Sequence, residues 1–260
     1  YALFKILKME QGNRPWYEWN SLYRLRDKAA LTEIAKKFNK ELQREKWIQY
    51  IFYSQWDSLR QYAKDHGVRF MGDVPYYVAH DSVDVWVNPK LFSLTDDGKL
   101  RTVAGVPPDY FNEDGQLWGM PVYNWSALKE TGYRWWIDRL AHNCRLFDQV
   151  RLDHFRAFAA FWEVSVDADS AKHGQWIAGP GIDFFDRAKD VLGNMPFVAE
   201  DLGDIDAAVY KVRDHYNLPG MAVLQFAFGE NMTQSPHIPH QYSRTTVAYT
   251  GTHDNNTTLS

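Results

Sequence analysis

The sequence predicts an α/β protein whose strands form a (β/α)₈ barrel with helical and loop insertions, with about five of the eight strands in this chain. Short apolar runs alternate with segments of helical periodicity, and this alternation is typical of parallel strand–helix units. At least four of the runs end in acidic or basic residues, which we expect to converge on one barrel mouth. The alternative, a doubly wound sheet, would place its ligand at a single switch point, and the sequence has no glycine-rich phosphate loop.

Residues 1–67 are expected to form a helical segment that is inserted in the barrel or flanks it. The longest helix is expected at about 41–66, and Gly67 then supplies a stop signal. Apolar residues recur at helical spacing on one face of this helix: Ile48, Ile51, Phe52, Leu59, Tyr62 and Ala63.

Residues 68–260 are expected to carry the barrel strands, with an active-site lid excursion at 75–145. The predicted strands are 68–74, 146–152, 197–199, 221–228 and 246–249. The excursion is far longer than an ordinary loop, and its aromatic content argues against disorder. The sequence starts without methionine and stops just after a motif, so we expect a fragment whose other three strands lie elsewhere.

The bulk composition narrows the class of partner. Aromatic residues make up 16% of the chain, which fits either a carbohydrate cleft or a large aromatic core. The net charge of −4 without a basic stripe argues against nucleic acid, and no apolar run approaches the roughly 18–20 residues of a membrane span. A single cysteine, Cys144, fits a reducing compartment, so we expect a cytoplasmic protein, or a plastid one if a targeting segment precedes it.

Two predicted strands end in candidate catalytic carboxylates. Arg151 and Asp153 should point the same way because strand side chains alternate, and the guanidinium should keep Asp153 ionised. Glu200 follows an apolar run, so partial burial should raise its pKa. Asp201 is the rival for that role, and taken singly these residues could equally form a structural ion pair or cap a helix.

A third carboxylate, Asp254, follows the last predicted strand beside His253. As an isolated pair these two residues suggest a metal site. Three acidic groups at three strand ends instead suit glycoside chemistry, in which one carboxyl attacks the anomeric carbon and a second exchanges protons. A third can bind hydroxyls of the distorted sugar.

The sequence resembles the 4-α-glucanotransferases, also called amylomaltases or disproportionating enzymes, which form glycoside hydrolase family 77 in the α-amylase clan. The resemblance covers nearly the whole chain. It rests on segments 14–16, 72–75, 81–86, 105–111, 115–119, 151–156, 199–203, 224–228 and 249–255.

This resemblance implies a (β/α)₈ barrel that transfers α-1,4-glucan segments and needs no metal or organic cofactor. It implies that Asp153 is the nucleophile, Glu200 the general acid/base and Asp254 the transition-state stabiliser. The implied substrate-binding residues are Asp73, Arg151, His253, Asp109, Tyr110, Phe111, Gln116 and Trp118. The segment 106–118 looks like the family's lid, which would keep water from the glycosyl-enzyme.

Three alternatives remain at this stage. One is an α-glucan hydrolase of the same clan. Another is a metal-dependent barrel enzyme that uses Asp153, His154, His253 and Asp254. The third is a non-catalytic glucan-binding protein, which would not require Asp153 and Glu200 together.

Overall fold

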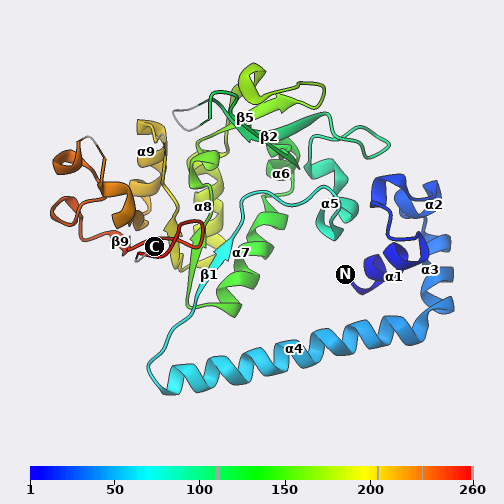
Figure 1. Cartoon of the computed structure of the whole chain (residues 1–260). Helices are drawn as coiled ribbons and strands as arrows, with labels where there is room; N and C mark the ends of the chain where they lie inside the picture. Colours follow the sequence, from blue (N-terminus) through cyan, green and yellow to red (C-terminus); the bar gives the residue numbers. More distant parts are fainter. Residues whose placement is uncertain (109–111, 204, 230, 259–260) are drawn as a thin grey trace. The chain divides into compact units, whose positions relative to one another are not determined.

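The structure is a computed structural model that describes residues 1–108, 112–203, 205–229 and 231–258 (Figure 1). The chain divides into two compact units. Unit 1 contains Tyr1–Arg69, Tyr77–Gly132 and Trp162–Ile177. Unit 2 contains Phe70–Tyr76, Tyr133–Phe161 and Ala178–Ser260. The predicted boundary between residues 67 and 68 stays a prediction.

Unit 1 begins with helices, two of which, α2 and α3, start at side-chain caps. The helices are α1 (Ala2–Glu10), the 3-10 turn η1 (Trp16–Glu18), α2 (Ser21–Arg24), α3 (Lys28–Lys37) and α4 (Asn39–Asp65). The side chain of Asn20 accepts a hydrogen bond from the Leu22 N–H, and that of Asp27 accepts one from the Ala30 N–H. These bonds satisfy amide groups that would otherwise lack partners in the first turn.

Helix α4 is continuous over its whole length, in agreement with the helix predicted at about 41–66 (Figure 1). Gly67 follows it with a left-handed φ of 72°. The predicted apolar face is mostly exposed in this chain, with Phe52 at 55% and Tyr62 at 64%, and only Ala63 is buried. Periodicity identifies a face that could be buried, but it does not supply a neighbour to cover it.

The remainder of unit 1 contains a small sheet. Its elements are α5 (Val83–Val87), η2 (Pro89–Leu91), β2 (Thr102–Val106), β3 (Gln116–Pro121), α6 (Trp125–Glu130), β5 (Ala160–Ser165), η4 (Ala171–His173) and β6 (Gln175–Ala178). The strands lie in the order β3-β2-β5-β6, and β2 is antiparallel to both neighbours. Val103, Val164 and Ala171 form its buried cluster. The stretch 75–145 is therefore built largely from helices and strands.

Unit 2 holds five parallel strands, and each overlaps one of the five predicted ranges. They are β1 (Met71–Val74), β4 (Gln149–Leu152), β7 (Phe197–Ala199), β8 (Gly220–Val223) and β9 (Thr246–Tyr249). The first three form one parallel sheet in the order β1-β4-β7, and β8 pairs with β9 in parallel. The Ala199 N–H donates to the Pro219 carbonyl at 2.8 Å, which continues the order from β7 to β8. Within the predicted range 221–228 only the part up to Val223 is strand, because Leu224–Ala227 forms a 3-10 turn.

Helices of unit 2 supply its aromatic core. They are α7 (Arg134–Leu146), η3 (Phe155–Phe158), α8 (Gly181–Leu192) and α9 (Ala207–His215), followed by η5 (Leu224–Ala227), η6 (Met232–Gln234) and η7 (Pro239–Gln241). The rings of Phe158 and Phe184 stack with centroids 5.3 Å apart, and Trp136 packs against both rings. Much of the aromatic excess therefore serves this core.

Candidate active site

Three neighbouring strands of unit 2 bring the first four site residues together. Asp73 of β1 lies beside Arg151 of β4 in the strand register. Asp153 directly follows β4, and its N–H donates to the Val74 carbonyl at 3.1 Å. Glu200 directly follows β7. Parallel strands end at the same edge of a sheet, so side chains at these ends share one site.

Arg151 links two of the carboxylates. Its Nη1 lies 2.7 Å from Asp73 Oδ2, and its Nη2 lies 2.9 Å from Asp153 Oδ1. The arginine side chain is 13% exposed, whereas those of Asp73 and Asp153 are 42% and 40% exposed. The planar fork of a guanidinium can hold two carboxylates in fixed directions.

The charge state of Asp153 reflects opposing influences. Burial is the largest cause and raises its pKa, Arg151 lowers it, and the charges of Asp73 and Asp254 raise it again. The net pKa lies above the ordinary aspartate value. Arg151 thus favours the ionised form as expected, but it does not outweigh burial and the neighbouring negative charges.

Glu200 has the environment expected for a group that gives and takes a proton near neutrality. Its pKa is raised to about 7, mainly by burial and also by the charge of Asp153. The N–H groups of His154 and Leu202 donate to its Oε2 and Oε1 at 2.8 and 3.0 Å, and these bonds lower the pKa, as does Arg151.

Asp201, the rival considered for the same role, has different partners. Its side chain is 5% exposed, it forms an ion pair with Arg213 at 2.5 Å, and it accepts the Met221 N–H at 2.7 Å. Helix α9 is capped by Asp206 instead. Asp201 therefore connects β7, β8 and α9.

The segment after β9 carries Asp254 and His253. The charge of Asp254 acts on the pKa of Asp153, so the two carboxylates lie within electrostatic reach of each other. His253 Nε2 lies 3.6 Å from Asp254 Oδ1, and both side chains are more than 70% exposed. The side chain of Asn255 accepts the Thr252 N–H at 2.8 Å and fixes the intervening turn.

Tyr249 is a site neighbour that the sequence analysis did not select. It is the last residue of β9, and its hydroxyl contacts Met71 Sδ at 3.5 Å. Its pKa is raised, mainly by burial and also by the charge of Asp73, while Arg151 acts to lower it. Its position at a strand end, shared with the acidic candidates, is the signal that could have identified it.

The predicted lid residues Gln116 and Trp118 belong to unit 1, whereas all three carboxylates belong to unit 2. Asp109, Tyr110 and Phe111 lie outside the described residues. Gln116 and Trp118 lie on β3, where Trp118 Nε1 donates to Gln116 Oε1 at 3.1 Å.

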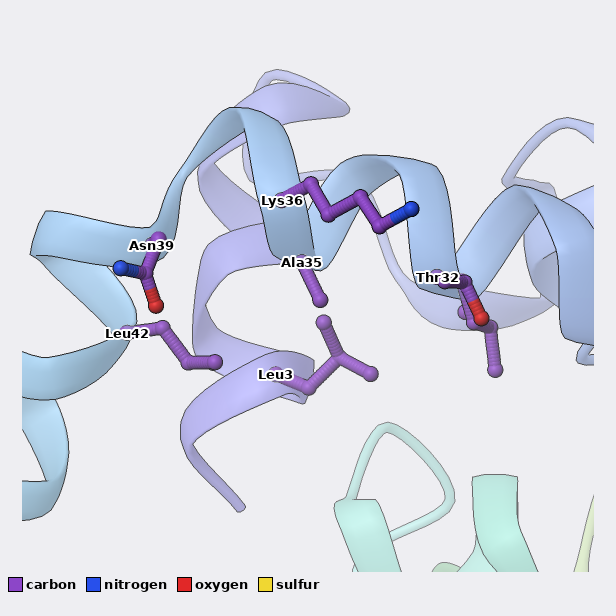
Figure 2. A pocket seen from close by; sticks show the side chains of 7 residues that line it. Leu3, Thr32, Ala35, Lys36, Asn39 and Leu42 are labelled. Carbon is purple, nitrogen blue, oxygen red and sulfur yellow. The ribbon is translucent and has the colours of Figure 1, made fainter.

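Unit 1 also contains a hollow of about 570 Å³ among α1, α3 and α4 (Figure 2). The side chains of Leu3 and Ala35 face each other across it, and Lys36 and Asn39 lie at its edge (Figure 2). Its lining contains no acidic residue, so this hollow offers none of the groups that glycoside chemistry needs.

Among the residues described, no group of three or more His, Cys, Asp and Glu side chains is arranged to hold a metal ion. None of the helices in the described parts of the chain is long and apolar enough to cross a membrane.

The fold and the site together define a β/α barrel with a cluster of carboxylates at the carboxyl ends of its strands. The sequence profile of the family described as 4-alpha-glucanotransferase, glycoside hydrolase family 77, matches residues 1–260. The chain belongs to this 4-alpha-glucanotransferase family, whose fold is the predicted (β/α)₈ barrel.

Curated relatives carry the same family name. The chain is 44% identical to the 4-alpha-glucanotransferase of Aquifex aeolicus over 254 residues, which cover 98% of this chain and 52% of that protein. It is also 44% identical to the Thermus thermophilus 4-alpha-glucanotransferase over 261 residues, covering 100% and 52%. The potato (Solanum tuberosum) relative is named 4-alpha-glucanotransferase, chloroplastic/amyloplastic, and is 44% identical over 98% of this chain. The chain thus spans about half the length of the first two relatives.

Solved structures agree with this assignment. Amylomaltase from Streptococcus agalactiae in complex with acarbose superposes with a TM-score of 0.94 at 40% identity, covering 98% of this chain and 52% of that one. Amylomaltase from Corynebacterium glutamicum gives a TM-score of 0.76 at 20% identity, which supports the fold alone.

Proposed function

We propose that the protein is a retaining 4-α-glucanotransferase, which moves an α-1,4-glucan segment from a donor glucan to an acceptor glucan or glucose. The observation that carries the proposal is the pairing of Glu200, whose pKa is raised to about 7, with Asp153, whose charge acts on Glu200 and whose carboxylate forms an ion pair with Arg151. A retaining enzyme needs one carboxyl group that is protonated and one that is ionised, roughly 5–5.5 Å apart.

In the first step Asp153 attacks the anomeric carbon of the donor, and the bond to the glycosidic oxygen breaks. Glu200 gives its proton to that oxygen, so the shortened glucan leaves as a neutral alcohol. Asp153 then carries the transferred segment as a covalent ester, and Glu200 is left ionised.

In the second step the ionised Glu200 takes the proton of the acceptor's hydroxyl group. The acceptor oxygen attacks the anomeric carbon, the ester bond breaks, and Asp153 is released as a carboxylate. Asp254 would bind hydroxyls of the distorted sugar, with Asp73, Arg151 and His253 as supporting ligands.

Transfer rather than hydrolysis requires that water be kept from the covalent intermediate. We assign this role to the segment 106–118, with Tyr110, Phe111 and Trp118 as its apolar groups and with Asp109 and Gln116 as polar sugar ligands. An α-glucan hydrolase of the α-amylase clan is the alternative if this shielding fails.

The test is incubation with maltotriose, followed by product analysis. Transfer gives glucose and a ladder of longer maltooligosaccharides, whereas hydrolysis gives shorter products alone. Asp153→Asn should reduce transfer by about 10³-fold or more. Asp190→Asn, the same change at an exposed position on α8, serves as control. Products no longer than the substrate would overturn the transferase assignment.

The expected partners are maltooligosaccharides or other α-1,4-glucans, and neither nucleic acid nor membrane is part of the proposal. We place the protein in the cytoplasm, or in a plastid if it comes from a plant, as the name of the potato relative suggests. Activity that persists after treatment with a metal chelator would remove the metal-dependent alternative.

A further inference from the structure

Just beyond the ends of β4 and β7 the hydrogen bonds between the two segments skip one residue, at the candidate nucleophile. In the regular part of the ladder, the Val150 N–H donates to the Pro196 carbonyl and the Glu200 N–H donates to the Leu152 carbonyl. If this parallel pattern continued, the N–H of residue 154 would donate to the Glu200 carbonyl. The structure instead uses the Phe155 N–H, at 3.1 Å. The turn between the end of β4 at Leu152 and the start of η3 at Phe155 therefore holds one residue more than a continued ladder would, and we call this bulge-like turn at Asp153-His154 the bulge.

The bulge frees the N–H of His154 from the ladder. That N–H donates to Glu200 Oε2 at 2.8 Å. The Glu200 backbone is held at the same time by Leu152 and Phe155, and its Oε1 accepts the Leu202 N–H at 3.0 Å. The carboxyl group of Glu200 is thus bound by the peptide unit that follows Asp153.

The bulge depends on an unusual backbone conformation. His154 has φ 49° and ψ 48°, in the left-handed region. Residues other than glycine enter this region at a cost, although Asn, Asp and His do so more readily than aliphatic residues. The imidazole itself is buried and its pKa is lowered to about 4, mainly by burial and also by Arg156, so it adds no positive charge near neutral pH.

We propose that the one-residue bulge at Asp153-His154 is a positioning device that fixes the carboxyl group of Glu200 relative to Asp153 through the backbone N–H of His154. This inference rests on the proposed function, in which these are the two reacting carboxyl groups. His154 acts through Glu200 and is a positioning residue. A single peptide unit then sets both the direction of the nucleophile and the hydrogen bond of the acid/base.

Two substitutions of similar shape separate the backbone from the imidazole. His154→Asn and His154→Leu both remove the imidazole, but Asn tolerates the left-handed region and Leu does not. The pKa of Glu200 is measured in each protein, expressed at its natural length, by NMR titration of ¹³C-labelled glutamate carboxyl groups. Glu200→Gln identifies the signal. Arg151 of β4 and Asp153 directly after it, the charged groups that act on Glu200, are unchanged in both variants.

We expect His154→Asn to keep the wild-type pKa of Glu200. His154→Leu should raise it by about 1 unit, because a hydrogen bond to the ionised carboxylate is lost. The basic limb of the pH profile of kcat/KM should move upward by the same amount, a shift that a loss of folded protein alone would not produce. Equal shifts in both variants, or none in either, would overturn the proposal.

A second pair of variants and a readout that is independent of turnover allow the test to contradict the proposal even if a variant fails to fold. If His154→Leu does not fold, His154→Gly and His154→Ala form a second pair, which differs by one Cβ and in its tolerance of positive φ. The NMR titration needs no turnover. A wild-type protein that fails to transfer glucan would overturn the proposed function, while the titration would still decide on the bulge.

Discussion

Glu200 and Asp201 are consecutive residues whose carboxyl groups have different partners. Glu200 accepts backbone N–H groups of His154 and Leu202, whereas Asp201 binds the guanidinium of Arg213 and the Met221 N–H. The first carboxyl group keeps a raised pKa, and the second joins secondary-structure elements within unit 2. Substitution of each should therefore affect a different property.

Glu200→Gln should reduce transfer from maltotriose by about 10³-fold or more while leaving the fold intact, because the amide cannot exchange the proton. Asp201→Asn should lower the free energy of unfolding by about 2 kcal/mol, because Arg213 loses a charged partner. Urea unfolding and product analysis on both variants check this. A fully active, equally stable Asp201→Asn protein would contradict the assignment.

The pH profile of kcat/KM should be bell-shaped. Activity should fall as pH rises through about 7, because Glu200 must be protonated to act as the acid. It should fall on the acid side below the raised pKa of Asp153, because that group must be ionised to attack. An activity that stays level up to pH 9 would argue against Glu200 as the acid.

The same pKa of Glu200 has a consequence for stability. Its folded pKa of about 7 exceeds the ordinary value of 4.5, so its contribution to stability is present below pH 4.5 and is lost as pH rises through 7. The free energy of unfolding of Glu200→Gln minus that of wild type should therefore be about 2–3 kcal/mol larger at pH 8 than at pH 4. Urea titrations at both pH values measure this, with Glu33→Gln on the surface of α3 as control.

Replacement of Arg151 should separate charge from geometry. Arg151→Lys keeps the positive charge, but a single ammonium group cannot reproduce the two directed contacts to Asp73 and Asp153. We expect transfer to fall by about 10²-fold, since misplacement of a reacting group is costly. Activity equal to wild type would show that charge alone suffices.

The lid hypothesis predicts a change in product ratio. Phe111→Ala and Trp118→Ala should each raise the ratio of hydrolysis to transfer on maltotriose, because less apolar surface would exclude water. Trp47→Ala, at a 61% exposed position on α4, is the matched control. An unchanged ratio in both lid variants would remove the lid role.

Gly72 provides a test of packing beneath the site. A Cβ atom at this position of β1 would overlap the Phe147 ring, so Gly72→Ala should destabilise the protein by about 1–3 kcal/mol. Gly229→Ala is the control because a Cβ there meets nothing within 4 Å. Thermal unfolding of the two variants should differ accordingly.

The sequence by itself determined the parallel strands and the residues at their ends. Period-2 alternation placed Arg151 and Asp153 on one side of β4, and both appear in one ion-pair network. Local patterns suffice here because a strand's side-chain direction follows from the backbone alone. The resemblance to 4-α-glucanotransferases rests on the same local segments.

Only the tertiary structure shows the different partners of Glu200 and Asp201, because the partners of Asp201 are 12 and 20 residues distant in the chain. The same holds for the exposure of the α4 apolar face and for the sheet of unit 1, whose strands β2 and β5 lie more than 50 residues apart. The bulge at His154 likewise depends on a register with β7. Burial and register arise from contacts between distant segments, and periodicity within one segment does not encode them.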